Sequence, residues 1–303
     1  ATPMAASDVA ILLGSWGPCP NACFVTMVAG SVALSDGTLG LDVKKLLTNS
    51  TPARIDELLK RSFLADPVET SVNSYLVNTG TKLVLIDTGA GRAFGPTLGF
   101  MVENLKAAGY QPEQVDEIYI THMHGDHIGG LVGNDALVFP NAIVRADQRD
   151  ASFWLSQRVM DSAPKDAKDV FTLAMKSFAV LNAAGKFKPF DGATELVPGI
   201  SSLPTYGHTP GHTAYAVRSK GQTMVMMGDM MHVGAVQFPM PAVTISFDTD
   251  SKAAASERRK MYARLAKERA WLAVAHLPFP GIGHIRSEGS GYVYVPANYT
   301  IPR

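Results

Sequence analysis

The sequence shows no excess of charge of either sign, no long apolar run and very little cysteine. Its 303 residues include 27 Lys and Arg and 27 Asp and Glu, so the formal net charge is +0 at pH 7. No extended block of Lys and Arg appears, which disfavours a nucleic-acid partner, because such partners are held mainly by clustered positive charge. No apolar run reaches the roughly eighteen residues that a membrane span requires, so we expect no membrane insertion.

The only cysteines are Cys19 and Cys23. Their spacing permits a short-loop disulfide in an oxidising compartment, and two free thiols are the alternative. A zinc site is disfavoured there, because no further Cys or His lies nearby in the sequence. Residues 1–25 show no hydrophobic periodicity, and we interpret them as an irregular N-terminal arm.

Apolar residues, in contrast, are plentiful. They make up 46% of the chain, which is enough for a sizeable core. The length allows one large domain or two, and because no linker stands out we predict a single domain over residues 1–303. From periodicity and turn residues we expect a strand over 28–35 ending at the turn 35–38, a helix within 43–63, a hairpin over 71–87, helices over 96–108, from 129, over 150–158, 166–184 and 251–269, and strands over 115–120, 142–145, 199–206, 213–218, 223–227 and from 271.

The most informative stretch is Thr121–Gly130, which places three imidazoles and one carboxylate within six residues. It follows the strand-like run 115–120, so the cluster lies where a strand ends. Successive strand residues point to opposite faces, so His122 and His124 share one face and can hold one metal ion. A turn at Gly125 then presents Asp126 and His127 together. Neutral imidazoles and an ionised carboxylate suit Zn²⁺ and similar ions.

This motif resembles that of the metallo-β-lactamase-fold hydrolases. The resemblance implies three further ligands, each after a strand-like run: His208 in the turn 207–212, Asp229 after the strand 223–227, and His276 after the strand from 271. It also implies the fold class, an α/β (α+β) protein built as a four-layer αβ/βα sandwich. The order of the expected elements shows the mixture of strands and helices, and the sandwich itself comes from the resemblance.

The resemblance assigns the ligands to two divalent metal ions, Zn²⁺ first, with Fe, Mn, Co or Cd as alternatives. One ion would be held by His122, His124 and His208, the other by Asp126, His127 and His276, with Asp229 bridging. Asp126 and Asp229 would then be the catalytic carboxylates, together with a metal-bridging hydroxide. Two Zn²⁺ against two carboxylates and one hydroxide leave about one net positive charge, which polarises an incoming oxygen.

A closer resemblance, over about residue 67 to the end, is to the methyl parathion hydrolase group and its lactonase relatives of the dihydrocoumarin hydrolase type. It rests on the stretches 83–89, 94–99, 104–116 and 279–286. In that group an aromatic pocket covers the metals. The matching substrate-pocket positions are Phe94, Trp154 and Phe171, with core packing as the alternative. We add Leu47 as a residue that would line the pocket, with ordinary packing as the alternative. His232, Ile245 and Phe247 would set substrate preference, with a surface or packing histidine as the alternative for His232.

Three further polar residues have an expected supporting role. In the resembled family the Asp-Thr-Gly at Asp87 lies beneath the metals, so Asp87 would orient a ligand histidine, with plain turn capping as the alternative. His212 and His284 are interpreted as residues behind the ligands or as structural histidines.

We therefore expect a dinuclear metal hydrolase of lactones or aryl esters, with organophosphate triester hydrolysis as a side activity. A phosphotriesterase is the first alternative, and a non-catalytic metal-binding member of the fold is the second. β-Lactam cleavage is disfavoured, because zinc β-lactamases generally have Cys or His where this chain has Asp229. The expected partner is a small neutral substrate, and relatives favour a homodimer. Because the resembled group includes exported enzymes, we expect a periplasmic or secreted protein, with the cytoplasm as the alternative.

Overall fold

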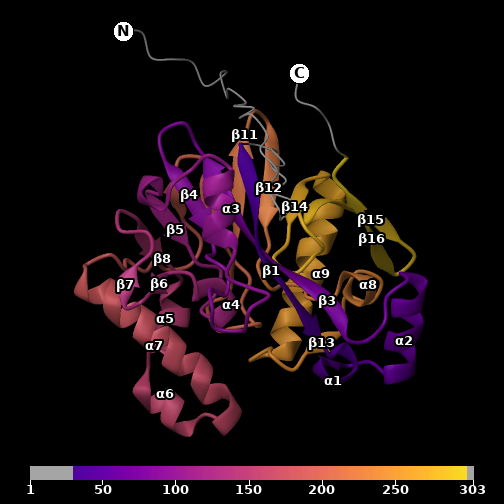
Figure 1. The fold of residues 1–303 in the computed structure, drawn as a ribbon. Helices are drawn as coiled ribbons and strands as arrows, with labels where there is room; N and C mark the ends of the chain where they lie inside the picture. Colours follow the sequence, from indigo (N-terminus) through magenta and orange to yellow (C-terminus); the bar gives the residue numbers. More distant parts are fainter. Residues whose placement is uncertain (1–29, 299–303) are drawn as a thin grey trace.

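The computed structural model describes residues 30–298, in which two β-sheets lie against each other between helices (Figure 1). The first sheet has the order β1 (Ser31–Leu41), β3 (Val68–Asn78), β4 (Leu83–Ile86), β5 (Glu117–Tyr119) and β8 (Ile143–Arg145). The second has the order β16 (Gly291–Pro296), β15 (Ile282–Glu288), β14 (Trp271–Ala273), β12 (Gln222–Met226), β11 (Thr213–Ser219), β10 (Ile200–Pro204) and β9 (Glu195–Val197). Two short pairs are added, β2 (Leu47–Thr48) with β13 (Thr244–Ile245) and β6 (Val132–Gly133) with β7 (Ala136–Leu137).

The helices flank the pair of sheets (Figure 1). They are α1 (Val43–Leu46), α2 (Pro52–Arg61), α3 (Met101–Ala107), α4 (Gly125–Ile128), α5 (Gln148–Trp154), α6 (Gln157–Ser162), α7 (Lys168–Ala183), α8 (Gly234–Gln237) and α9 (Ser251–Glu268), with short 3₁₀ turns at Pro112–Gln114 and Lys165–Ala167. Within the described residues, no helix combines the length and the apolar composition needed to cross a membrane.

Three apolar clusters define four layers. One joins the facing sides of the two sheets, as with Ile86 of β4 and Met226 of β12. A second packs the outer face of the first sheet against α3, α5 and α7, and a third packs the outer face of the second sheet against α9. Burial of these facing apolar surfaces holds the layers together. The predicted αβ/βα sandwich is confirmed.

Strand direction places the chemistry at one edge of this sandwich. Strands β4, β5 and β8 run parallel in the first sheet, and β12 and β14 run parallel in the second. The loops after β5, β12 and β14 therefore leave from carboxyl ends of strands, where polar side chains can converge. The loops 121–127, 227–233 and 274–277 carry six of the seven predicted ligands, and the loop after β10 carries the seventh, His208.

Several sequence predictions are confirmed in detail. The hairpin over 71–87 is β3 paired with β4, and the helices over 166–184 and 251–269 are α7 and α9. Thr51 caps α2, since its hydroxyl accepts a hydrogen bond from Arg54 N at 3.2 Å. The predictions for residues 1–25, including a Cys19–Cys23 disulfide, lie outside the described residues.

The predicted end of the first strand at the turn 35–38 is wrong. Strand β1 continues to Leu41, and the register against β3 shifts between Ser35 and Gly37, which marks a bulge. Gly37 has φ +124°, and a Cβ there would come within 2.0 Å of Thr97 O. Only glycine fits this approach, so the turn-like residues bend the strand instead of ending it.

Three helix predictions also need correction. The helix predicted from 96 begins at Met101, because Gly95 and Gly99 have positive φ. The helix predicted from 129 is instead α4, Gly125–Ile128, inside the histidine motif. The segment 150–158 splits into α5 and α6, since Ser156 caps a new helix by accepting from Val159 N at 3.4 Å.

The bulge in β1 turns Asp36 inward, where it supports the loop over 87–101. Its carboxylate accepts hydrogen bonds from Ala90 N at 2.9 Å, Gly99 N at 3.1 Å and Met101 N at 3.1 Å. The last of these satisfies a free N–H in the first turn of α3. Asp36 is buried, so this one side chain fixes the path from β4 to α3.

Replacing Asp36 with Ala should therefore lower the free energy of unfolding by roughly 2–4 kcal/mol, because three main-chain N–H groups lose their buried acceptor. Urea denaturation measures this loss. Glu113→Ala, on an exposed turn, is the matched control and should change little. A loss no larger than that of the control would contradict the role given to Asp36.

We also expect the effect of Asp36→Ala on stability to depend on pH. Burial, the largest cause, raises the pKa of Asp36 from 3.8 to about 6. The folded chain therefore keeps the Asp36 proton to a higher pH than the unfolded chain does. Proton binding at Asp36 thus stabilises the folded chain fully below the unfolded pKa, and this contribution to the free energy of unfolding is lost as the pH rises through the folded pKa. The stability difference between wild type and Asp36→Ala should be larger at pH 4 than at pH 7 in the same urea experiment.

Candidate metal centre

The predicted ligands come from four separate segments of the two sheets. The segment after β5 carries His122 and His124, and α4 carries Asp126 and His127. The loops after β10, β12 and β14 carry His208, Asp229 and His276. The structure brings all seven together in two groups: His122, His124, His208 and Asp229, and Asp126, His127, Asp229 and His276, with the candidate ligand atoms of each group within 4.8 Å of one another.

Asp229 is the residue common to both groups. Its Oδ2 lies 3.6 Å from His122 Nε2 and 3.4 Å from His208 Nε2. Its Oδ1 lies 3.1 Å from both His127 Nε2 and His276 Nε2. One carboxylate oxygen therefore faces each group, as a bridging position requires.

The charges of the cluster favour added positive charge. Burial lowers the pKa of His122 and His124, which leaves both rings neutral with a lone pair available. Burial also opposes the charged form of His276, yet the nearby Asp229 and Asp126 raise its pKa to about 10. Burial alone would raise the pKa of Asp229, but the imidazoles around it hold that pKa well below its usual range.

The donor set fits two divalent ions. His122 Nε2, His127 Nε2 and Asp229 Oδ1 are buried and have no hydrogen-bond partner among residues 30–298. Buried polar atoms are rarely left unpaired, so unpaired nitrogens that converge on a carboxylate indicate ligand positions. Mixed imidazole and carboxylate ligands suit zinc and similar ions.

Hydrogen bonds behind the ligands fix the orientation of their rings. Asp87 Oδ2 lies 2.8 Å from His127 Nδ1, and Asp87 also accepts from Thr121 N at 2.7 Å. Asp248 Oδ1 lies 2.8 Å from His208 Nδ1, and His276 Nδ1 lies 2.9 Å from the Ser71 carbonyl. Each partner accepts from Nδ1–H and so turns Nε2 towards the centre. Asp87 stands in the orienting position that the sequence suggested.

His212 supports Asp229 through the main chain. Its Nε2 accepts a hydrogen bond from Asp229 N at 3.0 Å, so Nδ1 carries the proton and faces Thr205 Oγ1 at 2.8 Å. Burial lowers the pKa of His212 to about 3, so the ring stays neutral and this tautomer persists. His284, in contrast, packs on Trp271 with ring centroids 3.9 Å apart and lies on β15, away from the seven ligands.

Two supporting carboxylates were not predicted from the sequence. Asp248 orients His208, as described above. Asp150 is buried in α5 and joins two ligand loops, because it accepts from Met123 N and from Gly211 N, both at 2.8 Å. Its only sequence signal is a carboxylate at a position that helix periodicity makes inward-facing, and a preceding cap residue, Asp147, makes that signal ambiguous.

The three predicted aromatic positions lie at different depths. Trp154 is buried, with its ring 5.1 Å from His124 and 4.5 Å from Phe171. Phe94 is 51% exposed, and a Cβ built on Gly125 would come within 2.8 Å of its ring, so Phe94 lies directly over α4. Trp154 and Phe171 are therefore buried rings beside the ligand His124, and Phe94 is an exposed ring over α4.

The other predicted pocket residues divide in the same way. His232 is buried with Nε2 3.1 Å from Asp229 Oδ2, and its ring stacks on His276 at 5.2 Å. Phe247 is 42% exposed, with its ring 6.1 Å from that of His232. Leu47 and Ile245 pair across β2 and β13 and lie in an apolar cluster with α1, α2 and α8. Both are almost fully buried, so they pack within this cluster and are not exposed beside the ligands as Phe94 and Phe247 are.

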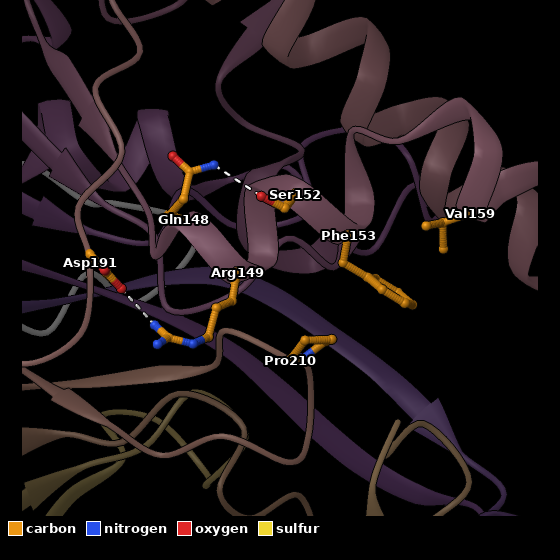
Figure 2. Close-up of a pocket in the computed structure, with 7 residues that line it drawn as sticks. All are labelled: Gln148, Arg149, Ser152, Phe153, Val159, Asp191 and Pro210. Carbon is orange, nitrogen blue, oxygen red and sulfur yellow. Dashed lines mark hydrogen bonds and ion pairs between the residues drawn. The ribbon is translucent and has the colours of Figure 1, made fainter.

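A separate surface pocket lies along α5 (Figure 2). Its volume is about 500 Å³, and Arg149 there donates to Asp191 at 2.8 Å. None of the predicted site residues lines it; its lining is Gln148, Arg149, Ser152, Phe153, Val159, Asp191 and Pro210. Two lining residues connect it to the metal centre: Pro210, from the loop that carries His208, and Phe153, whose ring lies 5.0 Å from that of Trp154.

Known proteins resemble this chain over most of its length. It is 36% identical to a hydrolase called AbOPH of the beta lactamase superfamily, with a TM-score of 0.87 over 92% of this chain and 98% of that one. It is 28% identical to AidC, described as a dizinc quorum-quenching lactonase in complex with a product, with a TM-score of 0.84 over 89% and 95% of the two chains.

The curated relatives match a shorter stretch. An N-acyl homoserine lactonase from Bacillus sp is 28% identical over 172 residues, which are 50% of this chain and 60% of that protein. The chain thus spans less than two thirds of the length of that relative. Residues 67–276 match the family described as the Metallo-beta-lactamase superfamily, and this stretch contains all seven candidate ligands. The chain therefore belongs to the metallo-beta-lactamase superfamily.

Proposed function

We propose that this protein is a metal-dependent hydrolase of small neutral lactones or aryl esters. The observation that carries the proposal is Asp229, whose two carboxylate oxygens face two complete ligand groups. The lactonase descriptions of AidC and of the Bacillus relative support the substrate class. A non-catalytic role is less well supported, because a complete set of seven ligands has no structural use in an already packed sandwich.

Two bound divalent ions would polarise a substrate oxygen and acidify a water molecule. The chain supplies the setting for that chemistry. Asp87 and Asp248 keep Nδ1 of His127 and His208 protonated, which leaves Nε2 of each ring free as a ligand atom. No Ser or Cys nucleophile is needed.

The side chains around the opening support a neutral, partly aromatic substrate. Phe94 and Phe247 are exposed apolar rings near the ligands, and Trp154 is a buried ring next to His124. Aromatic rings bury flat apolar groups well and offer no charge partner for an anion. Phosphotriesters share these features, so we propose organophosphate triester hydrolysis as a side activity.

His232 supports a preference for the flat acyl substrate. Its ring stacks on that of His276 and lies 6.1 Å from that of Phe247, and its Nε2 lies 3.1 Å from Asp229 Oδ2. Burial lowers the pKa of His232, so the ring is neutral, and its Nδ1 has no hydrogen-bond partner within the described chain. A polar atom in a narrow gap suits a planar ester more than a bulky triester with two alkoxy arms.

The first prediction concerns metal content. The wild-type protein should hold two ions, His276→Ala about one, and Asp229→Ala fewer than one, because Asp229 alone serves both ligand groups. Elemental analysis after gel filtration measures this, and aryl acetate hydrolysis should fall with the metal content. Asp191→Ala, an exposed carboxylate outside the cluster, is the control. Full activity with one tightly held ion would disprove the binuclear assignment.

The second prediction concerns substrate preference. Wild type should have a higher kcat/KM for dihydrocoumarin than for methyl parathion, and His232→Leu should shift the ratio towards methyl parathion by roughly thirtyfold. The lost polar contact costs the ester on the order of 1 kcal/mol, and relieved crowding favours the triester by a similar amount.

The two kcat/KM values are measured on both proteins with equal metal content. A wild-type preference for methyl parathion would reverse the proposed order and favour a phosphotriesterase as the main activity. A ratio that does not move on substitution would show that His232 does not select the substrate.

A further inference from the structure

Gln237 is the last residue of α8, and its side chain is fully buried. Its amide group forms three hydrogen bonds, all with main-chain atoms. Its Oε1 accepts hydrogen bonds from His232 N at 2.8 Å and Val233 N at 3.0 Å. Its Nε2 donates to the Val243 carbonyl at 3.1 Å. One side chain thus joins two segments that share no strand pairing, and neither the metal ligands nor the core explains why it is polar.

Arg258 of α9 completes the connection. It is fully buried; its Nε donates to the Met230 carbonyl, and its Nη1 donates to the Val243 carbonyl at 2.6 Å. Among the residues that the structure describes, no carboxylate forms an ion pair with it. Burying a cation is costly unless hydrogen bonds compensate, so these carbonyl contacts keep the two segments in place. We call Gln237 and Arg258 the clamp.

The clamped segments carry the side chains that face the opening. Residues 230–233 follow Asp229 and include His232, whose main-chain N–H is bound by Gln237. Residues 241–248 include Phe247, and they end at Asp248, which binds His208 Nδ1 at 2.8 Å and accepts from Ile245 N at 3.2 Å. The clamp therefore joins the segment that carries His232 to the segment that carries Phe247. The ring centroids of these two residues lie 6.1 Å apart, and we call this separation the gap.

We propose that Gln237 is a positioning residue that sets this gap and thereby the substrate preference of the site. The proposal rests on the proposed function, in which the His232 side of the cleft distinguishes planar from bulky substrates. Gln237 is the relevant member of the clamp, because it alone binds the main chain of His232, whereas Arg258 binds only carbonyl groups. Without the amide, the Val233 and His232 N–H groups lose their acceptor and the loop can shift away from Phe247.

Gln237→Met in the full-length, zinc-loaded protein tests this, because Met keeps the length of the side chain and removes all three hydrogen bonds. We expect KM for dihydrocoumarin to rise about fivefold with kcat within about twofold, and the preference over methyl parathion to narrow by a similar factor. Ser202→Ala is the control: its buried hydroxyl binds Thr194 N at 2.9 Å and Gly192 O at 2.8 Å in the second sheet. It should lose stability and leave the preference unchanged.

A double-substitution cycle separates positioning from plain destabilisation. If Gln237 acts through His232, then His232→Leu should change the substrate ratio several-fold less in the Gln237→Met background than in wild type. In the Ser202→Ala background it should have its full effect. Additive effects of Gln237→Met and His232→Leu, or a ratio within about twofold of wild type in active Gln237→Met protein, would overturn the proposal.

An independent readout keeps this test separate from the proposed function. The chain has 8 histidines, so a ¹³C-histidine NMR spectrum is simple, and His232→Leu identifies the His232 signal. Gln237→Met should shift or broaden that signal and leave His284, on β15, unchanged. If wild type hydrolyses neither substrate, the proposed function fails while this spectrum still decides the positioning. An unchanged His232 signal would overturn the proposal.

Discussion

The buried carboxylate of Asp229 is the point on which the rest of the site depends. Five imidazole nitrogens, from His122, His127, His208, His232 and His276, lie within 3.6 Å of its two oxygens. A charge buried this deeply is stable only with compensating positive charge. The two sheets bring these imidazoles to Asp229 by ending β5, β10, β12 and β14 at the same edge, so the sandwich and the ligand cluster are one arrangement.

The ligand positions could be predicted from the sequence because their signal is local. A run of β-branched and apolar residues followed by His or Asp identifies each strand end, as at Asp229 after β12 and His276 after β14. Apart from Asp87, which directly follows β4, the supporting carboxylates have no such signal. Asp36 reaches Met101 across 65 residues, Asp150 reaches Gly211 across 61, and Asp248 reaches His208 across 40. These pairings exist only in the folded chain, and periodicity carries no information on them.

The predicted boundaries of helices and strands were wrong where contacts with a distant segment of the chain determine the backbone conformation. A helix from Gly129 agrees with the local sequence, yet a Cβ on Gly129 would lie 2.1 Å from the Ala90 carbonyl and one on Gly130 would lie 2.1 Å from the Thr88 carbonyl. These glycines let the loop after β4 press against the end of the histidine motif. Gly129 and Gly130 end α4, and their lack of a side chain allows the two segments to approach each other. The prediction of a helix that begins at Gly129 was therefore wrong.

The metal ligands and the substrate wall are held by different anchors although they are close in sequence. The main chain of Asp229 is fixed by His212, and a Cβ on Gly228 would lie 2.8 Å from both the His212 ring and Thr121. Three residues later, His232 is fixed by Gln237, on the opposite side of the loop. A substitution at His232 or Phe247 therefore leaves the hydrogen bond from Asp229 N to His212 intact, and His232→Leu removes only the imidazole that lies 3.1 Å from Asp229 Oδ2. In the proposed function, this separation lets the side chains of His232 and Phe247 select between planar esters and tetrahedral phosphorus substrates without a change in the ligand set.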